Sequence, residues 1–119
     1  MPKAPREAPI YVATHDMLNW LVPHLEKWPR PQRFLLAREV MESATHFYRL
    51  LLRARKVQGQ ARAATLLDAD TELETLKALL RLGQERRYMN LGQYQHISKG
   101  LSDIGRQLGG WRKSAQGQG

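Results

Sequence analysis

The sequence predicts an all-α protein, an up-down-up-down bundle of four helices. Four stretches repeat apolar residues at alternating spacings of three and four, which places those residues on one face of a helix. Short segments containing Pro, Gly or Asn separate the stretches, and no segment shows the two-residue alternation of a β-strand. Because 119 residues suit one domain, we expect the bundle to occupy residues 10–113, with flexible ends at 1–9 and 114–119.

The first predicted helix ends at a Trp28-Pro29-Arg30-Pro31 connection. Its apolar stripe consists of Tyr11, Thr14, Leu18, Leu21, Leu25 and Trp28. The second predicted helix follows Pro31, which suits a first helical position because its missing N–H would go unused there. The stripe of this helix consists of Phe34, Ala37, Met41, Ala44, Tyr48 and Leu51.

The third predicted helix follows a Gln58-Gly59-Gln60 connection. Its stripe consists of Leu66, Ala69, Leu73, Leu76, Leu80 and Gly83. The fourth predicted helix follows Asn90, a suitable N-cap because its side chain accepts hydrogen bonds from free backbone N–H groups. Its stripe consists of Tyr94, Ile97, Leu101, Ile104, Leu108 and Trp111. Since the connections are short, successive helices are expected to be antiparallel neighbours.

Several apolar residues fall outside the four stripes and would face water in a single bundle. They are Trp20, Leu35, Leu36, Leu50, Leu67 and Leu82. A contiguous apolar set of this size is typical of a contact between subunits, whereas single exposed leucines are ordinary. The pattern favours self-association over a monomer with a wide core face.

Composition excludes several classes of protein. The chain has no cysteine, so disulfides, thiolate metal sites and cysteine nucleophiles are excluded. No apolar run is long enough for a membrane-spanning helix, and the N-terminus lacks the apolar region of a signal peptide. We therefore expect a cytoplasmic protein.

Metal-binding and catalytic patterns are weak. Glu42 and His46 share one helix face but have no further ligands nearby in the sequence. The acidic residues Asp68, Asp70, Glu72 and Glu74 lack the spacing of a calcium loop and are more typical of a charged helix face. The histidines at positions 15, 24, 46 and 96 are isolated, and no nucleophile or phosphate-loop motif accompanies them. We expect no metal, no cofactor and no enzymatic activity.

The chain is strongly basic, with 19 Lys and Arg residues against 11 Asp and Glu residues and a formal net charge of +8. Residues 28–62 hold eight bases and two acids, as do residues 77–119, and the four acids named above lie between these blocks. This charge favours a polyanionic partner, since guanidinium groups bind phosphates through paired hydrogen bonds. The candidate nucleic-acid-binding residues are Arg30, Arg33, Arg38, Arg49, Arg53, Lys56, Arg81, Arg86, Arg87, Lys99, Arg106, Arg112 and Lys113. The alternative is a basic face that serves only solubility.

No homeodomain, zinc-finger, basic-zipper or RNA-recognition pattern appears, so we expect contacts with the nucleic-acid backbone and a steep loss of affinity with salt. Trp20 and Trp28 are candidates for stacking on bases. Trp28 lies on an inward stripe, which favours a core position for it instead.

Four segments carry a resemblance to a known family. They are Leu18-Asn19-Trp20-Leu21-Val22-Pro23, Glu26-Lys27-Trp28-Pro29-Arg30-Pro31-Gln32-Arg33-Phe34-Leu35-Leu36, Leu79-Leu80-Arg81-Leu82 and Ile104-Gly105-Arg106-Gln107-Leu108-Gly109-Gly110-Trp111. With these segments the chain resembles the accessory variability determinant family of diversity-generating retroelements, from about Tyr11 to Lys113. In the last segment, Gly109 and Gly110 are expected to permit close backbone approach or a helix end, with Trp111 closing the core.

The resemblance implies a basic four-helix bundle that assembles into a homopentameric ring and has no catalysis of its own. It implies two kinds of partner, the retroelement reverse transcriptase and template-repeat RNA with possibly its cDNA. Family members support the copying of that RNA into adenine-mutagenised cDNA, which then replaces a variable repeat in a target gene.

Proteins encoded in intervening sequences of bacterial 23S ribosomal RNA genes are related and share the bundle and the pentameric assembly. They generally lack the basic excess and the Leu-Gly-Gly-Trp ending, so the sequence favours the retroelement family. A scaffold that binds only protein partners is the other alternative.

Overall fold

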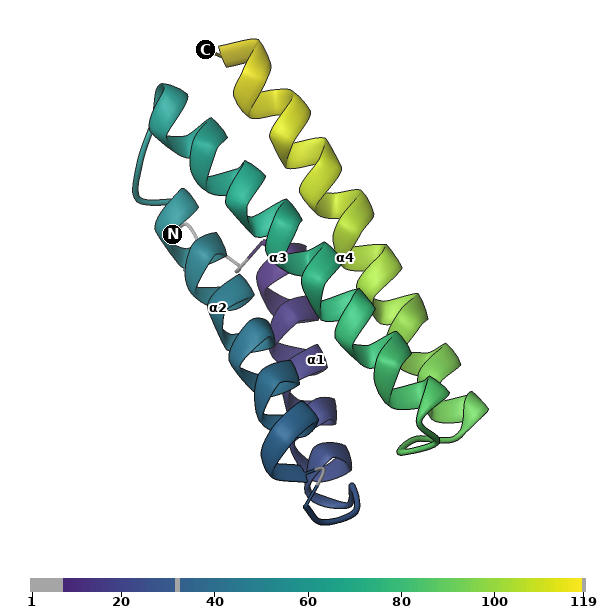
Figure 1. The fold of residues 1–119 in the computed structure, drawn as a ribbon. Helices are drawn as coiled ribbons and strands as arrows, with labels where there is room; N and C mark the ends of the chain where they lie inside the picture. The colour runs from purple at the N-terminus through teal and green to yellow at the C-terminus, as the bar shows by residue number, and fades with distance from the viewer. Residues whose placement is uncertain (1–7, 32, 119) are drawn as a thin grey trace, which may run out of the picture.

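The structure is a computed structural model that describes residues 8–31 and 33–118, and it is helical throughout, with no strand among those residues. Helix α1 spans Pro9–Glu26, α2 spans Arg38–Ala54, α3 spans Gly59–Glu85 and α4 spans Leu91–Gln118. A short π-helical segment, Arg33–Ala37, precedes α2. Each helix packs against its sequence neighbours, and α1 closes the bundle against α4 (Figure 1). The predicted four-helix bundle is confirmed.

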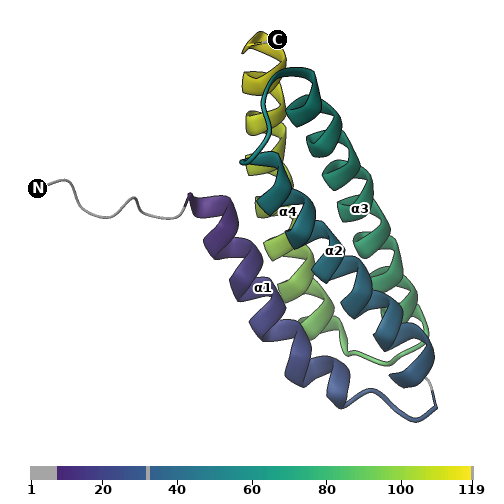
Figure 2. The same cartoon turned by 90° about the vertical axis from the view of Figure 1, so that its left-hand side faces the viewer.

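The two ends of the bundle differ in what they carry. The connections after α1 and after α3 lie at one end, which we call the turn end (Figure 2). The connection between α2 and α3 and the C-terminal end of α4 lie at the other, which we call the opposite end. The molecule measures 47 × 33 × 21 Å, so side chains at the two ends are separated by most of its length. No helix among the described residues is both long and apolar enough to cross a bilayer.

Three of the four predicted stripes form the core. On α3 every predicted residue is buried, and on α4 the four central residues are buried while Tyr94 and Trp111 pack against the core from its edges. On the first stripe, Leu18 is half-buried and the other five residues are buried. Trp28, just beyond the end of α1, is 3% exposed, which confirms its predicted core position.

The stripe predicted for α2 was wrong at its start. Phe34 was expected in the core but is 63% exposed, and Phe47, which the stripe omitted, is fully buried. The residues that α2 and its preceding turn bury are Ala37, Val40, Ser43, Ala44, Phe47, Leu51 and Ala54. The reason is the π-helical turn, in which each hydrogen bond spans one residue more than in an α-helix and the side chains after it are rotated. The predicted register holds after this turn, since Ala37, Ala44 and Leu51 are buried and Met41 and Tyr48 pack against the core.

The start of α4 is capped as predicted. The Asn90 side chain accepts a hydrogen bond from the Gln93 backbone N–H at 2.8 Å, and the Gln93 side chain accepts one from the Asn90 N–H at 3.0 Å. This reciprocal pair is a capping box, which satisfies two backbone donors that the helix itself leaves unpaired.

The end of α4 differs from the prediction. Residues 114–118, expected to form a flexible tail, continue the helix, whereas residues 1–7 and 119 lie outside the described residues. Gly109 and Gly110 lie inside this helix and are exposed, and a Cβ at either would meet no atom within 4 Å. They therefore provide neither a helix end nor a close approach within the chain. Helix propensity alone does not account for two glycines at these positions.

The apolar residues predicted to lie outside the core divide into two groups. Trp20, Leu36 and Leu50 are half-buried and pack against the core, so the expectation that they face water was wrong. Leu35, Leu67 and Leu82 are exposed, at 68%, 51% and 39%. Leu67 and Leu82 are separated by fifteen positions on α3, or about 22 Å at the helical rise per residue. The six residues do not form one contiguous apolar patch in the chain.

Candidate nucleic-acid interface

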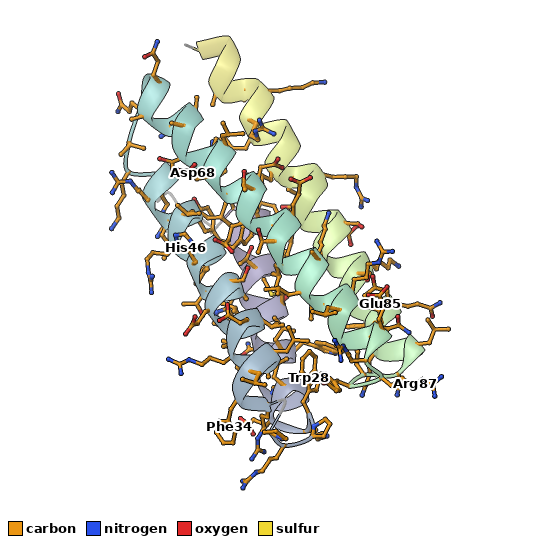
Figure 3. The ribbon with its side chains drawn as sticks, viewed as in Figure 1. Trp28, Phe34, His46, Asp68, Glu85 and Arg87 are labelled. Carbon is orange, nitrogen blue, oxygen red and sulfur yellow. The ribbon has the colours of Figure 1, made fainter. Side chains whose placement is uncertain are left out.

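Buried aromatic packing fixes the two connections at the turn end relative to each other. The ring of Trp28, from the connection after α1, lies 5.4 Å from the ring of Tyr88, from the connection after α3. The indole also packs directly over Gly83 of α3, where a Cβ would lie only 2.5 Å from its Cη2 atom. Segments that are distant in the sequence are thereby held together (Figure 3).

Six of the predicted binding residues lie around this turn end. They are Arg30, Arg33 and Arg38 beside the start of α2, and Arg81, Arg86 and Arg87 at the end of α3. Arg38 and Arg81 form ion pairs one helical turn along, with Glu42 at 3.0 Å and with Glu85 at 3.5 Å. Because these pairs are well exposed, they are weak and leave both guanidinium groups open to exchange partners.

Two of the bases at the turn end have structural features of their own. The Nη1 group of Arg33 donates to the Glu26 backbone carbonyl at 2.8 Å, so this side chain caps the end of α1. Arg87 has a φ of 63°, the left-handed conformation that usually calls for glycine. The N–H of Arg87 donates to the Gln84 carbonyl and that of Tyr88 to the Gly83 carbonyl, each at 2.9 Å, which is the hydrogen-bond pattern of a Schellman helix end.

A second group of predicted residues lies at the opposite end. Arg49, Arg53 and Lys56 lie at or just beyond the last two turns of α2, and all three are exposed. Arg112 and Lys113 lie near the end of α4. The Arg112 side chain, 31% exposed, binds Asp70 of α3 at 3.4 Å and so joins two helices. Arg112 is therefore less available to a ligand than Lys113, which is exposed.

The stripe predicted on α4 is present, since Lys99, Arg106 and Lys113 are all exposed and follow one another at seven-residue spacing. Arg106 is paired with Asp103 on its own helix. The structure thus distributes the thirteen predicted bases over two ends and one helix face. Within the described part of the chain, seven of them form neither an ion pair nor a side-chain hydrogen bond: Arg49, Arg53, Lys56, Arg86, Arg87, Lys99 and Lys113.

Two further arginines from the basic blocks have structural roles. The Nε of Arg62 donates to the backbone carbonyls of Ala54 and Val57, both at 2.9 Å, and satisfies acceptors at the end of α2. The guanidinium of Arg55 lies 4.8 Å from the centre of the Tyr11 ring, a cation–π contact between α2 and α1.

The acidic residues of α3 serve partly to join helices. Asp70 binds Arg112 of α4, as described above. Glu72 accepts hydrogen bonds from Ser43 Oγ and from His46 Nδ1 of α2, each at 2.6 Å, and its side chain is only 18% exposed. Asp68 and Glu74 are exposed, as expected for a charged helix face.

The Ser43–Glu72–His46 cluster lines a hollow of about 540 Å³ between α2 and α3. In a hydrolytic triad the serine hydroxyl bonds to the imidazole, which removes its proton. Here the Ser43 hydroxyl bonds to the carboxylate instead, so no imidazole contact activates it. His46 is directed to Glu72 and Glu42 to Arg38, and no group of three or more potential metal ligands occurs among the described residues.

The two tryptophans considered for base stacking are both used in packing. Trp28 is buried, as described above. The Trp20 indole is stacked on the imidazole of His24, at 3.7 Å between ring centroids, and on that of His96, at 5.1 Å. His96 belongs to α4, so this three-ring stack joins α1 to α4. Two of the four histidines that are isolated in the sequence, His24 and His96, are therefore brought together in space as packing groups.

One exposed aromatic residue was missed by the sequence analysis. Phe34 projects from the turn end (Figure 3), and one of the predicted arginines, Arg33, lies beside its ring. No local signal in the sequence marked it, because the preceding Pro31 equally suits the start of a regular helix.

A family model described as bAvd-like matches residues 10–115, which covers the four helices almost completely. Comparison with curated proteins gives no match. Because the family match spans most of the chain, this protein belongs to the bAvd-like family, that of the Avd protein of diversity-generating retroelements.

Proposed function

We propose that this protein is a non-catalytic accessory protein of a diversity-generating retroelement. It binds the reverse transcriptase together with template RNA or cDNA, and so supports mutagenic reverse transcription and retrohoming. The family membership supports the retroelement role, and the bases without ion-pair partners support binding to nucleic acid.

The observation that carries the proposal is the group Arg49, Arg53 and Lys56. These three side chains are exposed and form no ion pair within the described residues, so folding gives them no electrostatic compensation. Each phosphate that such a base neutralises releases a counterion and adds to affinity at low salt. The net charge of +8 attracts a polyanion from a distance in the same way.

Assembly into a homopentameric ring, as proposed from the family resemblance, would repeat this group around the ring. Once one subunit has bound the nucleic acid, the effective concentration of nucleic acid at the other subunits rises. Several weak phosphate contacts then act together. We therefore regard the protein as a multivalent cationic scaffold that holds RNA or cDNA beside the polymerase.

The test is charge reversal of the group, with all three residues changed to Glu. Binding of a fluorescently labelled RNA is measured by anisotropy over a salt titration, with helicity followed by circular dichroism and mass by light scattering. We expect loss of binding without change in helicity or mass, since no folding contact is removed.

A second triple variant, with Arg86, Arg87 and Lys99 changed to Glu, is the matched control because its members are equally without ion pairs. Loss of binding only in the control would move the site to α3 and α4. Retained binding in both would move the site to the bases beside the start of α2. Failure of the unaltered protein to bind RNA would contradict a phosphate-binding role and favour a scaffold that contacts only proteins.

A further inference from the structure

Phe34 is the one Phe, Tyr or Trp residue among those described whose side chain is exposed. Two groups of rings account for the rest. The buried rings are Tyr11, Trp28 and Phe47, and the half-buried rings that pack against the core are Trp20, Tyr48, Tyr88, Tyr94 and Trp111. Phe34 lies instead in a π-helical turn, an uncommon conformation that is frequent at functional sites. Phe34 is 63% exposed and therefore does not serve as a core residue.

The surroundings of Phe34 are cationic. The guanidinium carbon of Arg33 lies 5.7 Å from the centre of the phenyl ring, and Arg33 is itself held by its hydrogen bond to the Glu26 carbonyl. Arg30 precedes the π-helical turn and Arg38 follows it directly, and both are exposed. An exposed ring is thus supported by one arginine and flanked by two more.

This combination suits single-stranded nucleic acid. Proteins that bind single strands place aromatic rings, on which bases stack, within a basic surface that follows the phosphates. An apolar ring among arginines also suits a peptide, but three arginines within four residues of the ring match a chain that carries a phosphate at every nucleotide more closely. In a duplex, each base is already stacked and paired, so the ring has no free base to contact.

We propose that Phe34 is a stacking platform for an unpaired base of RNA or cDNA, with the neighbouring phosphates bound by Arg30 and Arg38. The proposal rests on the proposed function and deepens it, because it assigns the ligand as single-stranded nucleic acid. Stacking is tolerant of sequence, since every base has a π face. The site therefore prefers single-stranded to duplex nucleic acid and does not distinguish base sequences.

The test compares Phe34→Leu, Phe34→Trp and Leu35→Ala with the unaltered protein. Leu keeps an apolar side chain but removes the π face, whereas Trp keeps a π face. Leu35 is the matched control because it is adjacent and 68% exposed. Each protein is titrated with a labelled unstructured RNA and with a duplex of the same sequence, and its mass in solution is measured by light scattering.

We expect Phe34→Leu to weaken single-strand binding about tenfold, the loss typical of one base–aromatic stack, while duplex binding is unchanged. Phe34→Trp retains single-strand binding and Leu35→Ala changes neither ligand. Unchanged single-strand binding by Phe34→Leu would overturn the stacking role and leave the proposed function intact. An equal loss in Leu35→Ala, or a changed mass in Phe34→Leu, would overturn it too, since the face would then be an apolar or subunit contact. If the unaltered protein bound neither RNA, both proposals would fail.

Discussion

A single methyl group added at Gly83 should disrupt the packing that joins the two connections at the turn end. A Cβ at this position would lie 2.5 Å from Trp28 Cη2 and 3.0 Å from Cζ2, well inside normal contact distance. The indole has no room to withdraw, because it is 3% exposed and lies against Tyr88. Overpacking of this kind costs about 1–3 kcal/mol. Replacing a helical glycine by alanine returns about 1 kcal/mol, so Gly83→Ala should destabilise the protein by up to about 2 kcal/mol.

Gly100→Ala is the matched control. Gly100 lies in α4, and a Cβ there would meet nothing within 4 Å. This variant gains the helix propensity without the clash and should be about 1 kcal/mol more stable than the unaltered protein. The two variants thus differ by about 1–3 kcal/mol, equivalent to a separation of roughly 4 °C or more in Tm for a chain of this length.

Thermal unfolding followed by circular dichroism measures the difference, with all proteins at one concentration because association shifts Tm. A Gly83→Ala protein as stable as Gly100→Ala would refute the reasoning. It would mean that Trp28 moves aside at no cost, and that the two connections are not rigidly held.

Three further changes test other local contacts. Tyr11→Phe removes the buried hydrogen bond, 2.8 Å long, from the Tyr11 hydroxyl to the Leu51 carbonyl. This change should lower the free energy of unfolding, measured by urea denaturation, by about 1–2 kcal/mol. Arg87→Gly relieves the strain of the left-handed backbone conformation and should raise Tm. Arg86→Gly is the control, because Arg86 has an ordinary φ of −82°, and this change should lower Tm. The same shift in both variants would contradict the assignment of strain to Arg87. Asn90→Ala removes the cap of α4 and should destabilise the protein by about 1 kcal/mol, and a neutral effect would show that Gln93 alone suffices.

The sequence predicted the regular parts of this fold well, because apolar spacing reports directly on which helix face is buried. The stripe of α3 and the cap at Asn90 follow from local patterns of this kind. Phe34 did not, since the π-helical turn that exposes it depends on how the chain leaves the connection after α1. The tail at residues 114–118 was predicted to be flexible because it lies at the end of the chain, yet it continues the preceding helix.

The basic surface was predictable by residue type but not by arrangement. Counting charges identified the two basic blocks, and only the antiparallel topology showed that Arg30 and Arg87, far apart in sequence, lie at the same end. Pairing between residues that are distant in the sequence was also invisible. The roles of Arg62 as a helix cap and Arg112 as a partner of Asp70 depend on tertiary contacts.

The central claim is that this chain holds retroelement nucleic acid beside a reverse transcriptase. The most direct measurement is to purify the tagged protein from its native host in mild salt, identify the attached proteins by mass spectrometry and sequence the attached RNA. The account predicts a reverse transcriptase together with a repeat-containing non-coding RNA. Recovery of ribosomal RNA, or of no nucleic acid at all, would contradict it and would reduce the basic surface to a role in solubility or in contacts with protein partners.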